Sequence, residues 1–192
     1  MEDTGSQAQS NDGDLSVTAL YTSATWAWAK LPNAHLLVTR DAKIVFWITN
    51  LILACARVFV WKATSLRHSL VHRHALIDRL LERRCPTVVL EVAAGLSRRG
   101  VTVSEQPAVQ YIEVDLPQVI EHKKAQLMAS ALGRKVMERA NFHLIAGDVV
   151  SDSWEHDLPP GDVDIVISEG LLMYLTPTQR SRFFHRIQVL LG

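Results

Sequence analysis

A turn of small residues and an acidic residue 20 positions after it are the first features of this sequence that could bind a ligand. The turn is Glu91-Val-Ala-Ala-Gly-Leu-Ser97, and its glycine, Gly95, can adopt the positive φ that brings a backbone close to a ligand. Asp115 has the spacing at which an acidic residue holds ribose hydroxyl groups in nucleotide-binding folds. Alternatively, Asp115 is the N-cap of a helix that Pro117 begins, and Glu113 is a second ribose candidate that we rank lower on strand alternation.

Two further acidic residues follow apolar runs, and three histidines share one helical stretch. Asp148 comes after a Gly, and Glu169 comes directly after a serine that ends a β-branched run. A loop cap is the alternative role for Asp148, and bonding of a backbone amide is the alternative for Glu169. His68 and His72 share a face at i,i+4 spacing, with His74 nearby, but no third metal ligand is evident and we predict no metal site.

Alternating strand and helix patterns place these residues at one edge of a sheet. The predicted strands are 87–92, 109–114, 142–146 and 163–168. A helix is predicted over 117–132, with Gly133 at its end, and another after the capping box Thr176-Pro-Thr-Gln179. Near-continuous apolar strands separated by helices indicate an α/β fold with a parallel sheet, whose ligands bind at the carboxyl ends of the strands.

The part of the chain before the first strand differs from the rest. Residues 1–14 are polar and are predicted to be a flexible tail, and residues 15–84 an N-terminal helical lid or cap. Within it, 44–61 is apolar but contains Arg57 and is at the short end of a membrane span, so we interpret it as a core or lid helix. Residues 65–84 show helical spacing of leucines.

Composition excludes several classes of protein. The 192 residues carry 20 Lys+Arg and 20 Asp+Glu, so the broad basic surface of a dedicated nucleic-acid binder is not expected. Hydrophobic residues make up 48% of the chain, which is ordinary for a globular protein. The two cysteines, Cys55 and Cys85, form neither a disulfide scaffold nor a zinc motif, and with no signal peptide evident we expect a cytoplasmic protein.

Three ordered motifs resemble the leucine carboxyl methyltransferase family of class I S-adenosylmethionine-dependent methyltransferases. Within it, the closest resemblance is to bacterial O-methyltransferases of tetracenomycin-type polyketide synthesis. The motifs are Leu90–Ser97 with Arg99-Gly100, Tyr111–Pro117 with Lys123 or Lys124, and Ser168–Leu175. The resemblance implies a Rossmann-like fold with seven strands, of which residues 85–192 would supply the first four. The outer edge of the fourth strand would then be unpaired, which would permit self-association.

The resemblance also implies S-adenosyl-L-methionine as cofactor and a set of residues that bind it. Asp115 would hold the ribose, Asp148 the adenine amino group, and Arg73 the carboxylate, while Gly95 and Glu169 would lie beside the methionine moiety. A carboxylate acceptor would need no general base because it is already ionised at neutral pH, and no catalytic residue is identified. The cofactor-binding residues predicted are, in chain order, Arg73, Glu91, Ala93, Gly95, Asp115, Asp148 and Glu169.

Three functions follow from these expectations. The first is an O-methyltransferase that acts on a carboxylate or hydroxyl of a small, polyketide-like molecule. The second is a truncated, inactive cofactor-binding module that needs a partner or a longer chain. The third is a membrane-associated protein that uses residues 44–61, although we expect no stable membrane insertion.

Overall fold

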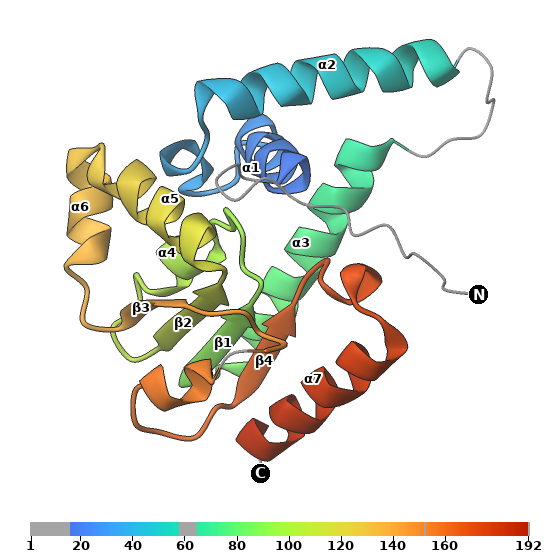
Figure 1. The fold of residues 1–192 in the computed structure, drawn as a ribbon. Coiled ribbons are helices and arrows are strands. Elements are labelled where there is room, and N and C mark those ends of the chain that lie inside the picture. Colours follow the sequence, from blue (N-terminus) through green and yellow to red (C-terminus); the bar gives the residue numbers. More distant parts are fainter. Residues whose placement is uncertain (1–15, 58–64, 152, 192) are drawn as a thin grey trace, which may run out of the picture.

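The computed structural model describes residues 16–57, 65–151 and 153–191, and it is an α/β fold in which four helical segments precede a parallel sheet (Figure 1). The predicted tail lies outside the described residues. The segments before the sheet are α1 (Val17–Trp28), η1 (Ala34–Leu36), α2 (Arg40–Arg57) and α3 (Leu66–Arg84). Both helices predicted in this region are therefore confirmed over the residues that the structure describes.

The sheet has four parallel strands in the order β3-β2-β1-β4. Their bounds are β1 (Val88–Val92), β2 (Gln110–Asp115), β3 (Phe142–Ala146) and β4 (Ile165–Ser168). The chain builds β1, β2 and β3 in one direction and then crosses to the other side of β1 to form β4. Ligands of open α/β sheets bind at such a reversal, beyond the carboxyl ends of the strands.

The connections between strands match the sequence prediction except at one point. β1 and β2 are joined through α4 (Arg99–Val103), and β2 and β3 through α5 (Pro117–Met128) and α6 (Ala131–Met137). The single helix predicted over 117–132 is wrong because Ser130 starts a new helix. Its side-chain oxygen accepts a hydrogen bond from the N–H of Gly133 at 2.9 Å, so Gly133 lies in the first turn of α6 and not at a helix end.

The last part of the chain confirms the capping box. After η2 (Trp154–Asp157), β4 and η3 (Leu172–Tyr174), the chain forms α7 (Pro177–Leu191). Gln179 N–H donates to Thr176 Oγ1 at 3.3 Å, and Thr176 N–H donates to Gln179 Oε1 at 2.9 Å. These reciprocal bonds satisfy two backbone donors and fix where α7 begins.

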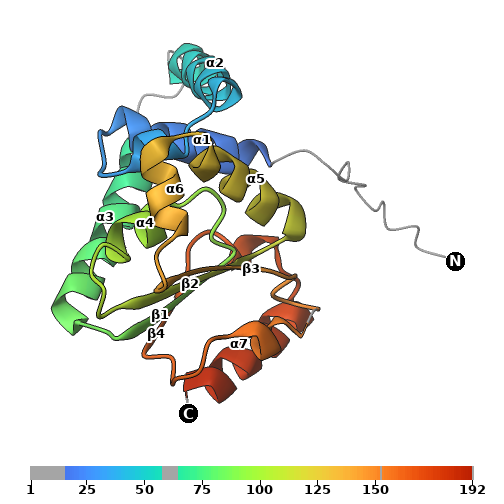
Figure 2. The same cartoon turned by 90° about the vertical axis from the view of Figure 1, so that its left-hand side faces the viewer.

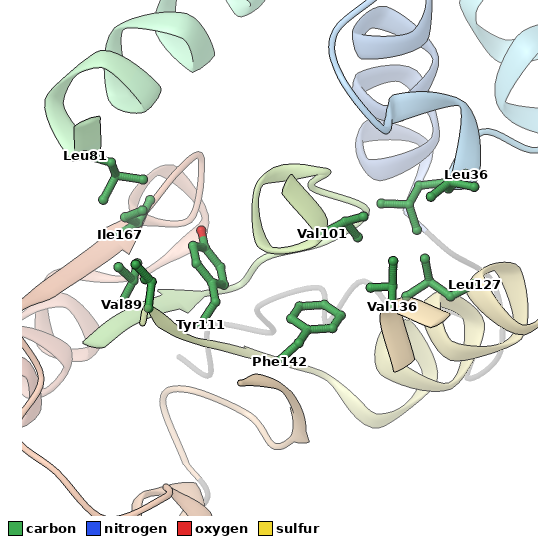
Figure 3. Packing of buried hydrophobic residues seen from close by; sticks show 11 residues of the cluster. Leu36, Leu81, Val89, Val101, Tyr111, Leu127, Val136, Phe142 and Ile167 are labelled. Carbon is green, nitrogen blue, oxygen red and sulfur yellow. The ribbon is translucent and has the colours of Figure 1, made fainter. Parts of the chain in front are cut away.

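Helices cover both faces of the sheet (Figure 2). On one face, α3 to α6 pack over a core that includes Val89, Tyr111, Phe142 and Ile167 (Figure 3). On the other face lie α7 and η2. The core there is formed by Leu90, Val92, Ile112, Val114, Ile145, Val149, Trp154, Val163, Leu175 and Phe183.

The first two helices form a separate layer. α1 packs against α2 through a small cluster that includes Tyr21, Ala24, Ala42 and Phe46. Figures 1 and 2 both show α1 between α2 and the sheet. Within the described ranges, no helix has the length and apolar character needed to cross a membrane.

Candidate functional site

In the turn after β1, Gly95 has the positive φ that we expected it to be able to adopt. Gly95 has φ +54°, and Ala93 also has a positive φ, +52°, which is uncommon for a residue with a side chain. A Cβ added to Gly95 would lie 3.9 Å from Cβ of Ala19, so α1 passes close to the turn. The turn thus lies between α1 and the carboxyl edge of the sheet.

Asp115, the last residue of β2, is bound to this turn. Its Oδ2 accepts a hydrogen bond from Gly95 N–H at 2.6 Å, and its Oδ1 accepts one from Leu116 N–H at 2.7 Å. Burial raises the pKa of Asp115, and the two N–H donors oppose that shift. Leu116 is the N-cap of α5. The alternative hypothesis, that Asp115 is the N-cap of this helix, is therefore wrong. Each carboxylate oxygen has a second lone pair for a ligand hydroxyl.

Glu113, the second candidate for ribose binding, forms an ion pair inside the protein. It is fully buried, and its carboxylate forms an ion pair with Lys123, whose Nζ also donates to Ser97 O at 2.7 Å. Burial raises the pKa of Glu113, and Lys123 opposes that shift. Our reason for ranking Glu113 lower was wrong, because residues two apart on a strand point to the same face. Glu113 differs from Asp115 in its depth within the strand and in its lysine partner.

Glu169, directly after β4, binds three side chains. Its Oε1 accepts from Arg73 Nε at 2.9 Å, and its Oε2 accepts from Arg99 Nη2 at 2.9 Å and lies 3.0 Å from His74 Nδ1. Burial alone would raise the pKa of Glu169, but the contacts with His74 and Arg99 outweigh burial and lower it to about 2. Glu169 is therefore ionised, and it holds Arg73 at the carboxyl edge of the sheet.

The centre of this arrangement is Arg99, which the sequence did not identify as a site residue. Arg99 is fully buried, and its guanidinium donates to Asp78 Oδ1 at 2.8 Å, to Glu91 and to Glu169. Burial alone would lower the pKa of Arg99, but Glu91, Tyr111 and Glu169 outweigh burial and raise it. One cation thus connects helix α3, strand β1 and the residue that follows β4.

Glu91 is placed by this cation and by a tyrosine. Only 2% of its surface is exposed, and its second oxygen accepts the hydroxyl of Tyr111 at 2.7 Å. The carboxylate lies beneath the turn and not at its surface. These contacts favour a positioning role for Glu91 over direct contact with a ligand.

His74 occupies the boundary between this network and the N-terminal helices. Its ring stacks on Trp26 with centroids 4.1 Å apart, and its Nδ1 lies 2.8 Å from Arg99 Nη2. Burial is the largest influence on His74 and lowers its pKa, although Glu169 opposes the shift. With His74 neutral, the arginines balance the charge of Glu169.

Arg73 reaches the site from α3 with its side chain 48% exposed. Its Nε is bound to Glu169, while its Nη groups have no protein partner among the described residues. A Cβ on Gly170 would lie 3.9 Å from Arg73 Nη2, which places the guanidinium beside the chain that leaves β4. A guanidinium in this position can bind a ligand carboxylate.

Asp148 follows β3 at the same edge. Its Oδ1 accepts from Val150 N–H at 2.9 Å and its Oδ2 accepts from Ser151 Oγ at 2.6 Å, which is the loop cap weighed as its alternative role. Gly147 N–H donates to Asp115 O at 2.8 Å, so the loop containing Asp148 begins beside the end of β2. Asp148 is thus a loop cap at the same sheet edge as Asp115.

Two of the three histidines of α3 make contacts of other kinds. His68 meets the ring of Trp28 edge-on with centroids 5.5 Å apart, while His74 is buried in the network above. In the part of the chain that the structure describes, no group of three or more His, Cys, Asp or Glu side chains could hold a metal ion.

A sequence profile decides which family these features belong to. The profile of leucine carboxyl methyltransferase matches residues 32–188, which include the turn, the ends of all four strands and α3. The chain belongs to the leucine carboxyl methyltransferase family. The α/β fold with its parallel sheet agrees with the methyltransferase fold that the resemblance implied.

Individual relatives are similar over part of the chain. The tetracenomycin polyketide synthesis O-methyltransferase TcmP of Streptomyces glaucescens is 28% identical over 109 residues, covering 57% of this chain and 37% of that protein. A Mycobacterium tuberculosis protein provisionally named an S-adenosyl-L-methionine-dependent methyltransferase is 31% identical over 109 residues, covering 54% and 34%. The chain thus matches about a third of the length of these relatives.

One solved structure is also similar. It is provisionally described as an O-methyltransferase from Nostoc punctiforme, with a TM-score of 0.49 and 21% sequence identity, covering 63% of this chain and 34% of that one.

The structure brings most of the predicted site residues together. The contacts above join Gly95 to Asp115 and Arg73 to Glu169, and Asp148 follows the neighbouring strand. What the sequence reading missed is the set of side chains beneath them. One signal was present in α3, because a polar pair at 74 and 78 continues to buried Leu81 at helical spacing, on the face turned toward the protein. The missed residues are His74, Asp78, Arg99 and Tyr111.

Proposed function

We propose that this chain binds S-adenosyl-L-methionine at the carboxyl edge of the sheet and belongs to an O-methyltransferase. The observation that carries the proposal is the hydrogen bond between Asp115 and Gly95. It places a carboxylate that could bind ribose hydroxyls beside a turn whose backbone could lie close to a ligand. Family membership and the names of the relatives support the same cofactor. We extend the proposal to a small, polyketide-like acceptor in the cytoplasm, on the name of TcmP and on the sequence expectations.

The residues present fit the chemistry of this cofactor. Asp115 would accept the ribose hydroxyls, and Arg73 would bind the amino-acid carboxylate through the Nη groups that Glu169 does not use. Asp148 would receive the adenine amino group, and Gly95 with Ala93 would line the methionine moiety. In this arrangement Glu91 and Glu169 serve chiefly to position the turn and Arg73.

Catalysis in this proposal depends on positioning. When bound, S-adenosyl-L-methionine supplies an electrophilic methyl group that an acceptor oxygen takes in an in-line displacement. The chain's own residues would orient the sulfonium end against the sheet edge, and α1, which lies over Gly95, would exclude water from it. Transfer to a carboxylate requires no base, whereas a hydroxyl acceptor would have to release its proton to a base in solution.

Calorimetric titration with S-adenosylhomocysteine tests the binding site. Asp115→Ala should weaken binding roughly 10–100-fold, because a charge-assisted hydrogen bond to the ribose is lost. The exposed Glu121→Ala on α5 is the matched control and should bind like the parent chain. If Asp115→Ala stays folded by circular dichroism and binds equally well, the ribose role is wrong.

A second titration tests Arg73. Arg73→Met should weaken S-adenosylhomocysteine but leave methylthioadenosine unchanged, because only the first ligand has a carboxylate. Equal losses for the two ligands would contradict carboxylate binding.

A binding module without activity is the second candidate function, because one observation favours it. β4 is an edge strand of the described sheet, and the exposed Met173 and Tyr174 lie on η3, which follows it. Such an edge can pair with another chain. Transfer of a labelled methyl group to a panel of phenols and carboxylic acids separates the candidates, since the module would bind S-adenosylhomocysteine but transfer nothing.

A further inference from the structure

Helix α2 presents an apolar stripe to solvent. The stripe recurs at helical spacing, and each of its large members is more than half exposed. Its members are Ile44 at 55%, Trp47 at 66%, Ile48 at 53%, Leu51 at 66% and Ile52 at 62%, with exposed Cys55 at its end. Soluble monomers rarely expose contiguous apolar surface of this kind, so the stripe is expected to contact a binding partner or a lipid surface.

The opposite face of α2 is the one that packs on the protein. Ala42 and Phe46 are buried against α1, and α2 is the outermost layer of the molecule in both views of the ribbon (Figures 1 and 2). Because residues 44, 48 and 51 lie on the far side of the helix from residues 42 and 46, the stripe points away from the body. A flat surface could approach it without meeting the sheet or its candidate site.

The charge of the molecule is distributed unevenly. Residues 16–84, which contain α2, carry 10 Lys and Arg against 3 Asp and Glu, a net charge of +7. Residues 85–192 carry 10 against 13, a net charge of −3. Arg40 lies one turn before Ile44 on the same face of α2, and Lys43 and Asp41 are exposed in the same turn, so two cations and one anion adjoin the stripe.

This charge distribution favours a lipid surface over a second copy of the chain as the partner of the stripe. A second copy of the chain would bring two regions of +7 together, which opposes pairing through α2. An anionic lipid surface provides apolar acyl chains for the stripe and negative headgroups for its flanking cations. Because no described helix is long and apolar enough to cross a bilayer, such a helix would lie along the surface.

We propose that α2 is a peripheral membrane-binding element that docks the chain on anionic lipid. Trp47, Leu51 and their neighbours enter the boundary between headgroups and acyl chains, while Arg40 and Lys43 contact the headgroups. The proposal is independent of the methyltransferase function, because α1 separates α2 from the sheet.

Co-sedimentation of the 192-residue chain with vesicles tests the proposal. Vesicles of phosphatidylcholine mixed with phosphatidylglycerol should bind the chain about tenfold more strongly than pure phosphatidylcholine, and added salt should weaken binding. Leu51→Asp should abolish binding, whereas Val189→Asp, an equally exposed change on α7, should not. Arg40→Gln with Lys43→Gln should remove the preference for phosphatidylglycerol.

Several results would overturn the proposal. Absence of binding to mixed vesicles would do so, as would equal binding by Leu51→Asp while circular dichroism shows it folded. Sedimentation velocity tests the alternative that a second copy of the chain binds the stripe, because it measures whether the chain dimerises. A dimer that Leu51→Asp dissociates, without vesicle binding by the parent chain, would assign the stripe to a second copy.

Discussion

The two faces of the parallel sheet are built from the same strands, yet one is packed with apolar side chains and the other contains buried charges. Toward α7, Leu90, Val92 and Ile112 are fully buried among other apolar residues. Toward α3 to α6, Glu91 and Glu113 are just as deeply buried, and they are neighbours in the register of β1 and β2. Alternation along each strand separates the two sets.

The difference assigns separate tasks to the two faces. Burial of apolar side chains stabilises the fold wherever it occurs, but it fixes no particular polar group. On the charged face, Glu91 is matched by Arg99 and Glu113 by Lys123, and each cation also contacts a group at the carboxyl edge. The charged face therefore couples stability to the geometry of the candidate site.

Removal of the central cation should have the largest effect. Arg99→Leu leaves Asp78, Glu91 and Glu169 without the guanidinium that binds all three, and loss of one partner in a buried ion pair costs about 3–5 kcal/mol. Urea unfolding followed by circular dichroism should show this loss. The exposed Arg182→Leu is the control and should change stability little. An equally small effect of Arg99→Leu would mean that the charged face does not depend on it.

Lys123→Met should have the next largest effect, about 3 kcal/mol at pH 8, and the effect should depend on pH. Burial already raises the pKa of Glu113, and removal of its cation raises it further. A carboxyl group whose folded-state pKa is raised loses stability as the pH rises from its unfolded value toward the folded one. The penalty should therefore shrink toward pH 5. Lys124→Met, its exposed neighbour, should show no such dependence.

The apolar face and the strand ends could be predicted from the sequence because their signals are local. The four β-branched runs predicted each strand to within two residues, and the capping box at Thr176 predicted the start of α7. The predicted helix over 117–132 was wrong because its apolar pattern continues through Ser130, where a new cap interrupts it. Local patterns identify apolar positions better than the points at which helices break.

The charged network could not be predicted because its partners are distant in sequence. Arg99 and Glu169 are 70 positions apart, and a single sequence gives their types without their pairing. Strand-end position indicated Asp115 and Glu169 as site residues, whereas Arg99 was noted only as part of a family-like motif, without a role of its own. The roles of Arg73, Asp115 and Asp148 toward a cofactor stay predictions.

Tyr111→Phe should have a smaller effect on the charged face. The variant removes the hydroxyl that donates to Glu91 at 2.7 Å inside the protein, which should cost about 1–3 kcal/mol. Urea unfolding should show the loss, and Tyr174→Phe should show a much smaller one, because its exposed hydroxyl shares only a solvent-accessible hydrogen bond with Thr18 Oγ1 at 3.3 Å. Calorimetry should also show weaker S-adenosylhomocysteine binding, because Glu91 and Arg99 position the edge. Unchanged stability would indicate that the Glu91 carboxylate needs no hydrogen bond from Tyr111 and that its ion pair with Arg99 is sufficient.

Ile112→Val, at the next residue, makes the sharpest comparison because its side chain points to the opposite face. Loss of one buried methylene should cost about 0.5–1.5 kcal/mol, close to the lower end of the range for Tyr111→Phe. Because Ile112 belongs to the apolar core cluster on the face opposite the charged network, the loss should leave S-adenosylhomocysteine affinity unchanged. If Ile112→Val weakens the ligand as much as Tyr111→Phe does, the site responds to general stability, and the charged face has no special part in positioning it.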